Sequence, residues 1–176
     1  MSRGIDIYNI YSGTSVDPSY PPNGSIPDWT PATVTGTVYS AAISHNQGNI
    51  PLGATTGNTY GGKQYVEPFV GETQVLMLKV ITPLSGGSSA VTVNLLTDVD
   101  DTGTNAPATI ATLSIPYATT ADTYFVLELT PQLAFKIYSL LQYVIGGESM
   151  GVAAWIAPKK ALDFIQNYVS GWVIVS

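Results

Sequence analysis

The sequence predicts an all-β fold, an antiparallel β-sandwich of about eight strands, on three observations. Short apolar segments separated by polar turns follow one another from residue 73 to residue 155. Several of these segments alternate apolar and polar residues, which is the period-2 pattern of a half-buried strand. Strands do not alternate with helices, so a parallel Rossmann-type sheet is not expected. The pattern therefore favours a sandwich of jelly-roll type.

Residues 1–31 are expected to form an extended arm. Five prolines break any helix and disfavour a central strand. A proline-rich segment with many aromatic residues is suited to lying on a protein surface, because proline lowers the entropy lost on binding. A floppy terminus is the alternative. The candidate partner-interface residues of the arm are Tyr8, Tyr11, Tyr20, Ile26 and Trp29.

Residues 32–176 are expected to form the sandwich. The β-prone segment at residues 34–43 contains Gly36, which suggests a bulge because the apolar residues do not keep one phase. Residues 45–71 hold six glycines and two prolines. A loop this long is commonly functional or disordered, so we expect partner contacts within it. The candidates there are Asn49, Tyr60 and Tyr65.

Residues 74–81 and 90–96 are the clearest strands, and the Gly/Ser-rich turn between them predicts a hairpin. The first strand is apolar on both faces, so it is expected to lie centrally and to be covered on each side. The second strand alternates, with Val91, Val93 and Leu95 directed inward.

The later strands are expected at residues 109–115, 124–129, 136–145, 152–156 and 172–175. Their expected inward residues are Ala111, Leu113, Ile115, Phe125, Leu127, Leu129, Val152, Ala154 and Ile156. Gly146–Gly147 is expected to end the third of these strands.

One short helix is expected at residues 159–169. Leu162, Ile165 and Val169 recur at i, i+3 and i+7, which gives a narrow amphipathic face. Gly171 is a suitable stop after it.

Composition excludes several chemistries. The chain has 176 residues and no cysteine, so a disulfide framework, a thiolate nucleophile and a cysteine metal site are absent. Charged residues make up 10% of the chain, against about 25% in ordinary domains. Solubility must come largely from neutral polar side chains. This is typical of β-rich assembly proteins, although an all-β domain with a weakly charged surface would look the same.

The charge pattern argues against nucleic-acid and membrane partners. The formal net charge is −6, and the six Lys and Arg residues are scattered. Phosphate neutralisation needs a basic stripe, and an anionic membrane surface needs a basic patch. No apolar run approaches the roughly 20 residues that span a bilayer, and the N-terminus lacks the apolar core of a signal peptide. We expect synthesis in a cytoplasm.

Residues 147–151 match the G-x-S-x-G nucleophile elbow, with Ser149 at its centre. The elbow requires a strand-to-helix turn and a nearby general base. Strands are expected on both sides of Ser149, and His45, the one histidine, lies upstream of it. A β-turn at a hairpin tip is the preferred interpretation, and an esterase is the alternative. No catalytic residue and no cofactor are predicted.

The acidic segment at residues 98–105 partly resembles a calcium loop, with Asp98, Asp100 and Asp101 as weak metal-ligand candidates. Thr109 occupies the twelfth position, where a bidentate Glu is needed, and no helices flank the segment. A solvated acidic turn is the preferred interpretation.

From about residue 66 to residue 158 the order of segments resembles the jelly-roll capsid cement (decoration) proteins of tailed bacteriophages. The strand at 74–81, the Gly/Ser tip, the acidic loop and the strands that follow occur in the same order. The closest local match is residues 136–147, KIYSLLQYVIGG, where members show a basic residue and two tyrosines before a glycine-rich turn. Members often carry more basic residues there than this chain does.

The resemblance implies a dimer or trimer on the outer surface of a capsid, which bridges neighbouring major capsid protein subunits. We therefore expect a non-enzymatic virion protein made in the host cytoplasm. The alternatives are a glycan-binding β-sandwich of the virion and another head or tail component.

Overall fold

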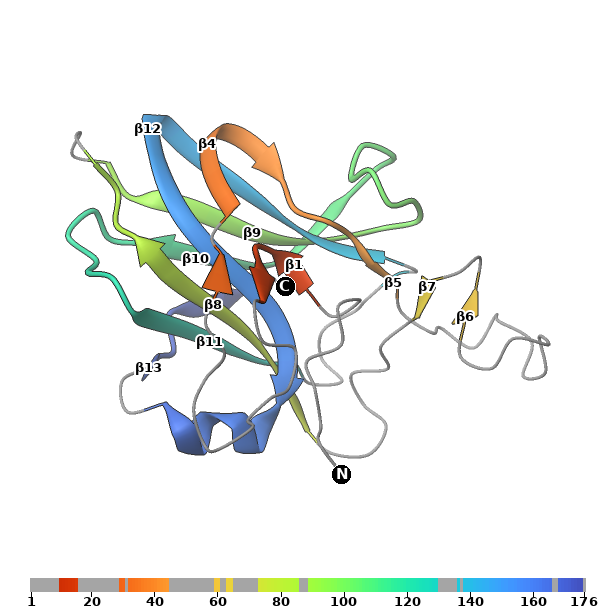
Figure 1. Ribbon diagram of the computed structural model, residues 1–176. Helices are drawn as coiled ribbons and strands as arrows, with labels where there is room; N and C mark the ends of the chain where they lie inside the picture. The colour runs from red at the N-terminus through yellow and green to blue at the C-terminus, as the bar shows by residue number, and fades with distance from the viewer. Residues whose placement is uncertain are drawn as a thin grey trace.

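The computed structural model describes residues 10–15, 29–30, 32–44, 59–60, 63–64, 73–85, 89–129, 136, 138–165 and 168–175. Most of them lie in β-strands, which confirms the all-β prediction. One ten-stranded sheet and two two-stranded sheets are formed (Figure 1).

The ten-stranded sheet contains six longer strands and four short ones. The longer strands are β4 (Ala32–Tyr39), β8 (Gln74–Thr82), β9 (Val91–Asp98), β10 (Ala108–Ile115), β11 (Thr123–Leu129) and β12 (Tyr138–Pro158). The short strands are β1 (Ile10–Ser12), β5 (Ile43–Ser44), β13 (Tyr168–Val169) and β14 (Trp172–Ile174). The small sheets pair β2 (Thr14–Ser15) with β3 (Trp29–Thr30), and β6 (Thr59–Tyr60) with β7 (Lys63–Gln64).

The long strand β12 organises the sheet. Its first part, from Tyr138 to Val144, pairs with β9, and its second part, from Gly151 to Pro158, pairs with β8. β4 pairs along the opposite side of both parts. The sheet therefore divides at β12 into a β9–β10–β14 branch and a β8–β11–β13 branch. In Figure 1, β12 curves through the molecule with β4 beside it.

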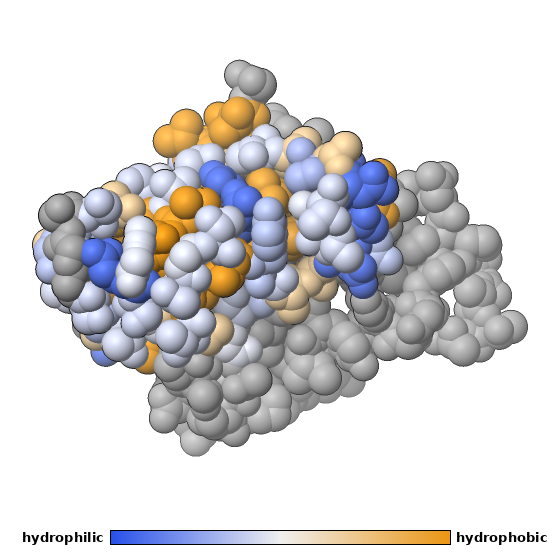
Figure 2. All heavy atoms as spheres, turned by 90° about the horizontal axis from the view of Figure 1, so that it is seen from above, coloured by the Kyte–Doolittle hydropathy of each residue, from blue (hydrophilic) through white to orange (hydrophobic). Residues whose placement is uncertain are grey.

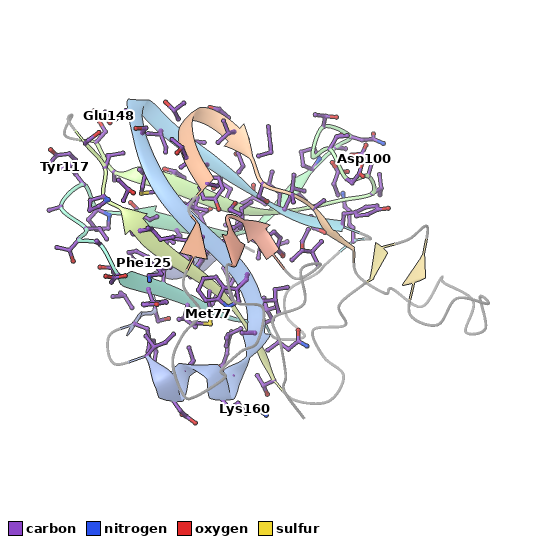
Figure 3. All side chains as sticks on the ribbon, viewed as in Figure 1. Met77, Asp100, Tyr117, Phe125, Glu148 and Lys160 are labelled. Carbon is purple, nitrogen blue, oxygen red and sulfur yellow. The ribbon has the colours of Figure 1, made fainter. Side chains whose placement is uncertain are left out.

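A glycine-rich irregularity lies between the two parts of β12. Between the pairs Val144–Thr37 and Ser149–Thr35, β12 advances five residues while β4 advances two. Gly147 and Gly36 have φ angles of +58° and +65°, which is the left-handed region that favours glycine. A bulge increases local twist and bends a strand. The predicted irregularity at Gly36 is thus present, and Glu148 lies at this bend of β12 (Figure 3).

The main hydrophobic core joins the inner faces of the two branches. Val93, Leu95 and Leu113 come from one branch, and Leu78 and Phe125 from the other. Every residue predicted to point inward is buried in this core, because the period-2 pattern follows the pleat of the strands.

The outer face of the β8–β11–β13 branch carries a second apolar cluster. Trp155 is fully buried and packs edge-to-face on Tyr124, with ring centroids 6.5 Å apart. Ile165 belongs to this cluster, and Leu162 of the 3₁₀ helix η2 (Lys159–Phe164) packs against it. Val75 is also part of it, so β8 is buried on both faces as predicted.

The C-terminal tail spans the free edges of the two branches. β13 pairs with β11 in parallel, and β14 pairs with β10 in antiparallel fashion. Gly171 lies between them, and a Cβ atom there would be 3.0 Å from Leu113 Cδ1 and 3.5 Å from Phe125 Cδ1. The chain therefore crosses from one branch to the other at a position where a larger residue would be crowded.

Three local predictions need correction. β8 and β9 do not form the predicted hairpin, because β12 lies between them in the sheet. Gly146–Gly147 does not end a strand but lies within β12. The predicted helix at residues 159–169 is replaced by the 3₁₀ helix η2 and the strand β13, since Tyr168 and Val169 pair with β11.

The N-terminal segment is attached to the body of the protein at β1. Ile10 and Ser12 pair with Trp155 and Ala154 of β12, and the carbonyl of Tyr11 accepts a hydrogen bond from Ala41 N–H. Residues 10–12, within the predicted arm, are thus part of the main sheet. The chain's last predicted strand is confirmed as β14.

Candidate binding face

One face of the sheet is open among the described residues. It is the outer side of β4, β12, β9 and β10, and it spans about 14 Å across the strands. We call it the outer face and define it by eight residues in two rows: Tyr39, Gln142, Asn94 and Thr112, then Thr37, Val144, Thr92 and Ser114. All eight are exposed or half-buried, and none carries a charge.

A ladder of hydrogen bonds links the first row of the outer face. Thr112 Oγ1 donates to Asn94 Oδ1 over 2.9 Å, and Asn94 Nδ2 donates to Gln142 Oε1 over 2.9 Å. Gln142 Nε2 donates to the Tyr39 hydroxyl over 2.9 Å. The four residues are direct cross-strand partners, so the sheet register alone brings them together.

The direction of the ladder determines what it offers to a partner. The Tyr39 hydroxyl accepts from Gln142, which leaves its own proton available for donation. Each amide uses one N–H and one lone pair in the ladder and keeps another of each. Chained hydrogen bonds polarise one another, which strengthens the donor at the end of the row. The face is thus neutral but rich in both donors and acceptors.

The acidic loop at residues 99–107 borders the outer face. Leu96 and Leu140 are buried cross-strand partners outside the main core, and a Cβ atom on Gly103 would be 2.5 Å from Leu140 Cδ1. Gly103 has a φ of +71°, so glycine is needed both for space and for backbone conformation. The loop therefore covers the next row of the sheet and limits the outer face on that side.

Asp98 holds this loop in place. Its side chain is fully buried, and its carboxylate accepts hydrogen bonds from Val99 N–H at 2.6 Å and Asn105 N–H at 3.1 Å. Asp100 accepts from the N–H and hydroxyl of Thr102, and these hydrogen bonds lower the pKa of the Asp100 carboxyl. The side chain of Lys136 donates to the carbonyl of Ala106.

The metal-ligand candidates do not converge in the described residues. Asp98 is directed at backbone N–H groups, whereas Asp100 lies in the exposed part of the loop (Figure 3). Within the part of the chain that the structure describes, no group of three or more His, Asp or Glu residues, Asp101 included, is arranged to hold a metal ion.

Tyr11, predicted at a partner interface, is instead a core residue. Its side chain is 2% exposed, and its hydroxyl is 2.5 Å from Ser139 Oγ. The neighbouring Ser12 Oγ lies 2.8 Å from the hydroxyl of Tyr143, which is also fully buried. Burial raises the pKa of both tyrosines well above the ordinary value, with their hydrogen bonds acting in the opposite direction.

The other predicted interface residues are placed only in part. The backbones of Trp29 and Tyr60 lie in β3 and β6. The remaining ones lie outside the described residues: Tyr8, Tyr20, Ile26, Asn49 and Tyr65. His45 lies outside them as well.

Ser149 is not at a nucleophile elbow. It lies within β12 and pairs with Thr35 of β4, and Thr35 Oγ1 donates to the carbonyl of Glu148. The predicted β-turn at a hairpin tip is also wrong, because the strand continues through residues 147–151. A strand followed by a helix, which would expose the serine, is not formed there.

The sequence did not single out the outer face. Apart from Val144, its residues are polar or hydroxyl-bearing positions of alternating strands, which normally indicate nothing more than a solvated surface. What distinguishes them is that all eight of these positions, on four neighbouring strands, are uncharged. That property depends on the order of strands in the sheet, which the sequence pattern alone did not provide.

No family model and no curated protein matches this chain. Among the residues that the structure describes, there is no helix of the length and apolarity needed to cross a membrane.

Proposed function

We propose that this chain is a non-enzymatic structural protein of a phage virion, a capsid cement protein with a jelly-roll-type sandwich. It lies on the outer surface of the capsid and bridges neighbouring major capsid protein subunits, acting as a dimer or trimer. The capsid assignment derives from the order of strands and the segment at residues 136–147, which resemble those of phage decoration proteins.

The observation that carries a binding role is the uncharged outer face. Burying an unpaired charge against a partner is costly, whereas a neutral polar group loses little if it regains its hydrogen bonds. The charged side chains of β8 and β11 lie on the other branch: Lys79 pairs with Asp122 at 2.8 Å, and Glu128 with Lys159. Asp98 of β9 is buried and accepts hydrogen bonds from backbone N–H groups, and Glu148 lies at the bend of β12. Figure 2 shows that strongly hydrophilic residues cover a small part of the surface seen from above.

The two branches differ in what covers their outer sides, and this difference supports the same role. The outer side of β8 and β11 is covered by η2 and forms a second core. In the described part of the chain the outer face has no such cover beyond the acidic loop. A sheet face four strands wide, with donors and acceptors in register, suits a protein surface better than a small substrate.

Single added charges on the outer face test this proposal. Ser114→Glu and Thr37→Glu place a carboxylate at exposed positions of β10 and β4, outside the ladder. Lys160→Gln, on the exposed surface of η2, is the matched control because it changes the net charge by the same amount. Co-sedimentation with capsid shells that lack decorating proteins measures the affinity.

We expect both face variants to bind shells at least tenfold more weakly than wild type, since an unpaired interfacial charge costs about 2 kcal/mol or more. Lys160→Gln should bind as wild type does. Equal binding by all four proteins would refute a role for the outer face. No binding by wild type would refute cementing itself.

A glycan-binding role is favoured by one specific feature. Tyr39 is 44% exposed and stands beside Gln142, so an aromatic ring and an unused amide N–H lie together. Aromatic rings that pack on sugars, next to amides that bind hydroxyl groups, are suited to carbohydrate recognition. A glycan array with wild type and Tyr39→Ala would separate this role from cementing, because only a glycan-binding protein would show a Tyr39-dependent signal.

A further inference from the structure

The C-terminal strand β14 has one open edge in the described structure. β14 pairs with β10 on one side, and β13 pairs with β11 through Tyr168 and Val169 alone. Beyond Gly171 the chain leaves β11, so no described strand pairs with the second side of β14. An open edge presents unpaired N–H and C=O groups, which are a template for another strand.

The side chains at this edge are apolar and exposed. Val173 is 66% exposed, and Ile174 and Val175 are each 48% exposed. Natural edge strands are usually protected by lysine, proline or an inward charge. Residues 164–176 contain none of these protecting residues. Together, Val173, Ile174 and Val175 form what we call the C-terminal edge.

We infer that the C-terminal edge pairs with the same edge of a second copy of this chain. The inference rests on the proposed function, in which the protein acts as an oligomer that bridges capsid subunits. It adds the surface through which two copies join. A two-fold axis lets one surface bind itself without any other complementary partner.

Charge favours a second copy as the occupant. Two chains with a formal net charge of −6 repel each other, so a self-contact is favoured where the surface carries no negative charge. β9, β10 and β14 together contain one charged residue, Asp98, which is buried and hydrogen-bonded to backbone N–H groups. A basic or acidic partner would find no opposite charge along this edge, whereas a second copy needs none.

The backbone geometry sets the register of the pair. Val175 N–H donates to the carbonyl of Ile110 over 3.1 Å, so it points toward β10. Because N–H groups alternate along a strand, the N–H and C=O of Ile174 point to the open side. An antiparallel pair centred on Ile174 then exchanges two hydrogen bonds between the two Ile174 residues. Val173 of each chain lies opposite Val175 of the other.

Such a pair would also join two outer faces. Val173 pairs with Thr112 at the end of the ladder row, so edge-to-edge pairing continues the sheet across the axis. The result is one uncharged face of twice the width. Such a face could lie across the boundary between two capsid subunits.

Disulfide trapping in this cysteine-free chain tests the pairing. In Ile174→Cys, two thiols related by the axis would have Cα atoms about 5.5 Å apart, within disulfide range. Val99→Cys is the matched control, because Val99 is 47% exposed and lies on the acidic loop. We expect oxidised Ile174→Cys to form covalent dimers at least tenfold faster than Val99→Cys. Equal rates would overturn the inference.

Sedimentation velocity over a concentration series supplies the second measurement. Wild type should dimerise with an affinity on the order of micromolar, as suits a small contact, and Val173→Lys should be monomeric over the same range. Val144→Lys, which adds the same charge to the outer face away from the edge, should dimerise like wild type. Monomeric wild type, dimeric Val173→Lys or monomeric Val144→Lys would each overturn the inference.

These outcomes are distinguishable from failure of the proposed function. The isolated chain is tested here, without capsid shells. If the wild-type protein dimerises through this edge but does not bind shells, the inferred pairing is supported and the cement role is refuted. If it binds shells as a monomer, only the inferred pairing is refuted.

Discussion

Removing both members of the buried Ser12–Tyr143 pair should destabilise the protein by less than the sum of the two single removals. The two hydroxyl oxygens lie 2.8 Å apart, and Ser12 and Tyr143 are 7% and 0% exposed. Tyr143→Phe keeps the ring but leaves Ser12 Oγ without its partner. A buried polar group left unpaired costs about 1–3 kcal/mol. For a chain of this size that lowers the melting temperature by roughly 2–4 °C per kcal/mol.

The double variant separates the hydrogen bond from other effects. Ser12→Ala leaves the Tyr143 hydroxyl unpaired, so each single variant should lose about 2 kcal/mol. Ser12→Ala/Tyr143→Phe removes both polar groups and should lose clearly less than the sum of the two, with a coupling energy of about 1 kcal/mol or more. Urea unfolding followed by tryptophan fluorescence measures all four proteins. Additive losses, within about 0.4 kcal/mol, would refute the view that β1 is fastened to β12 through this pair.

Three further outcomes are expected. Gly103→Ala should lower the stability in thermal unfolding more than Gly36→Ala does. Both glycines have a positive φ, which costs a non-glycine residue about 1–2 kcal/mol, but only at Gly103 would the new Cβ lie 2.5 Å from Leu140 Cδ1. Equal losses of stability would contradict the crowding at Gly103. Asp98→Ala should speed proteolysis of the acidic loop at residues 99–107, because two backbone N–H groups lose their acceptor; an unchanged cleavage rate would contradict this. Burial raises the folded-state pKa of Tyr143 above the ordinary 10.0, so the stability that this group contributes is complete below pH 10 and is lost as pH rises above it. In alkaline titration of wild type and Tyr143→Phe, the difference in tyrosinate absorbance should therefore appear only together with unfolding of the wild type, and a difference in the folded state at pH 10 would contradict the burial.

Periodicity predicted which residues of each strand are buried but not which strands are neighbours. The inward positions of β9, β10 and β11 follow from alternation, which depends on each strand by itself. The predicted pairing of β8 with β9 was wrong because β12, far along the chain, lies between them. Such long-range pairing depends on the packing of whole branches and leaves no trace in a local pattern.

Glycine was misread at the bend of β12 for a related reason. A Gly-Gly pair usually ends a strand. Here Gly147 allows β12 to bend within one continuous strand, because β4 bends with it at Gly36. The C-terminal segment shows the same effect, since Tyr168 and Val169 satisfy a short helical pattern but pair with β11. In both places tertiary pairing overrides the local preference.

The outer face could be predicted only in its chemistry. The low content of charged residues indicated a neutral surface, but the ladder from Thr112 to Tyr39 needs four strands in register. Tyr11 shows the converse error: an aromatic residue in a proline-rich segment was expected on a surface, yet β1 carries it into the core.

A cryo-EM reconstruction of the virion tests the central claim most directly. The claim predicts density for this β-fold on the outer surface of the capsid, with β4, β12, β9 and β10 turned toward the major capsid protein and Ser114 in the contact. Density for this chain in the tail or neck, or on the capsid with the outer face turned to solvent, would contradict it.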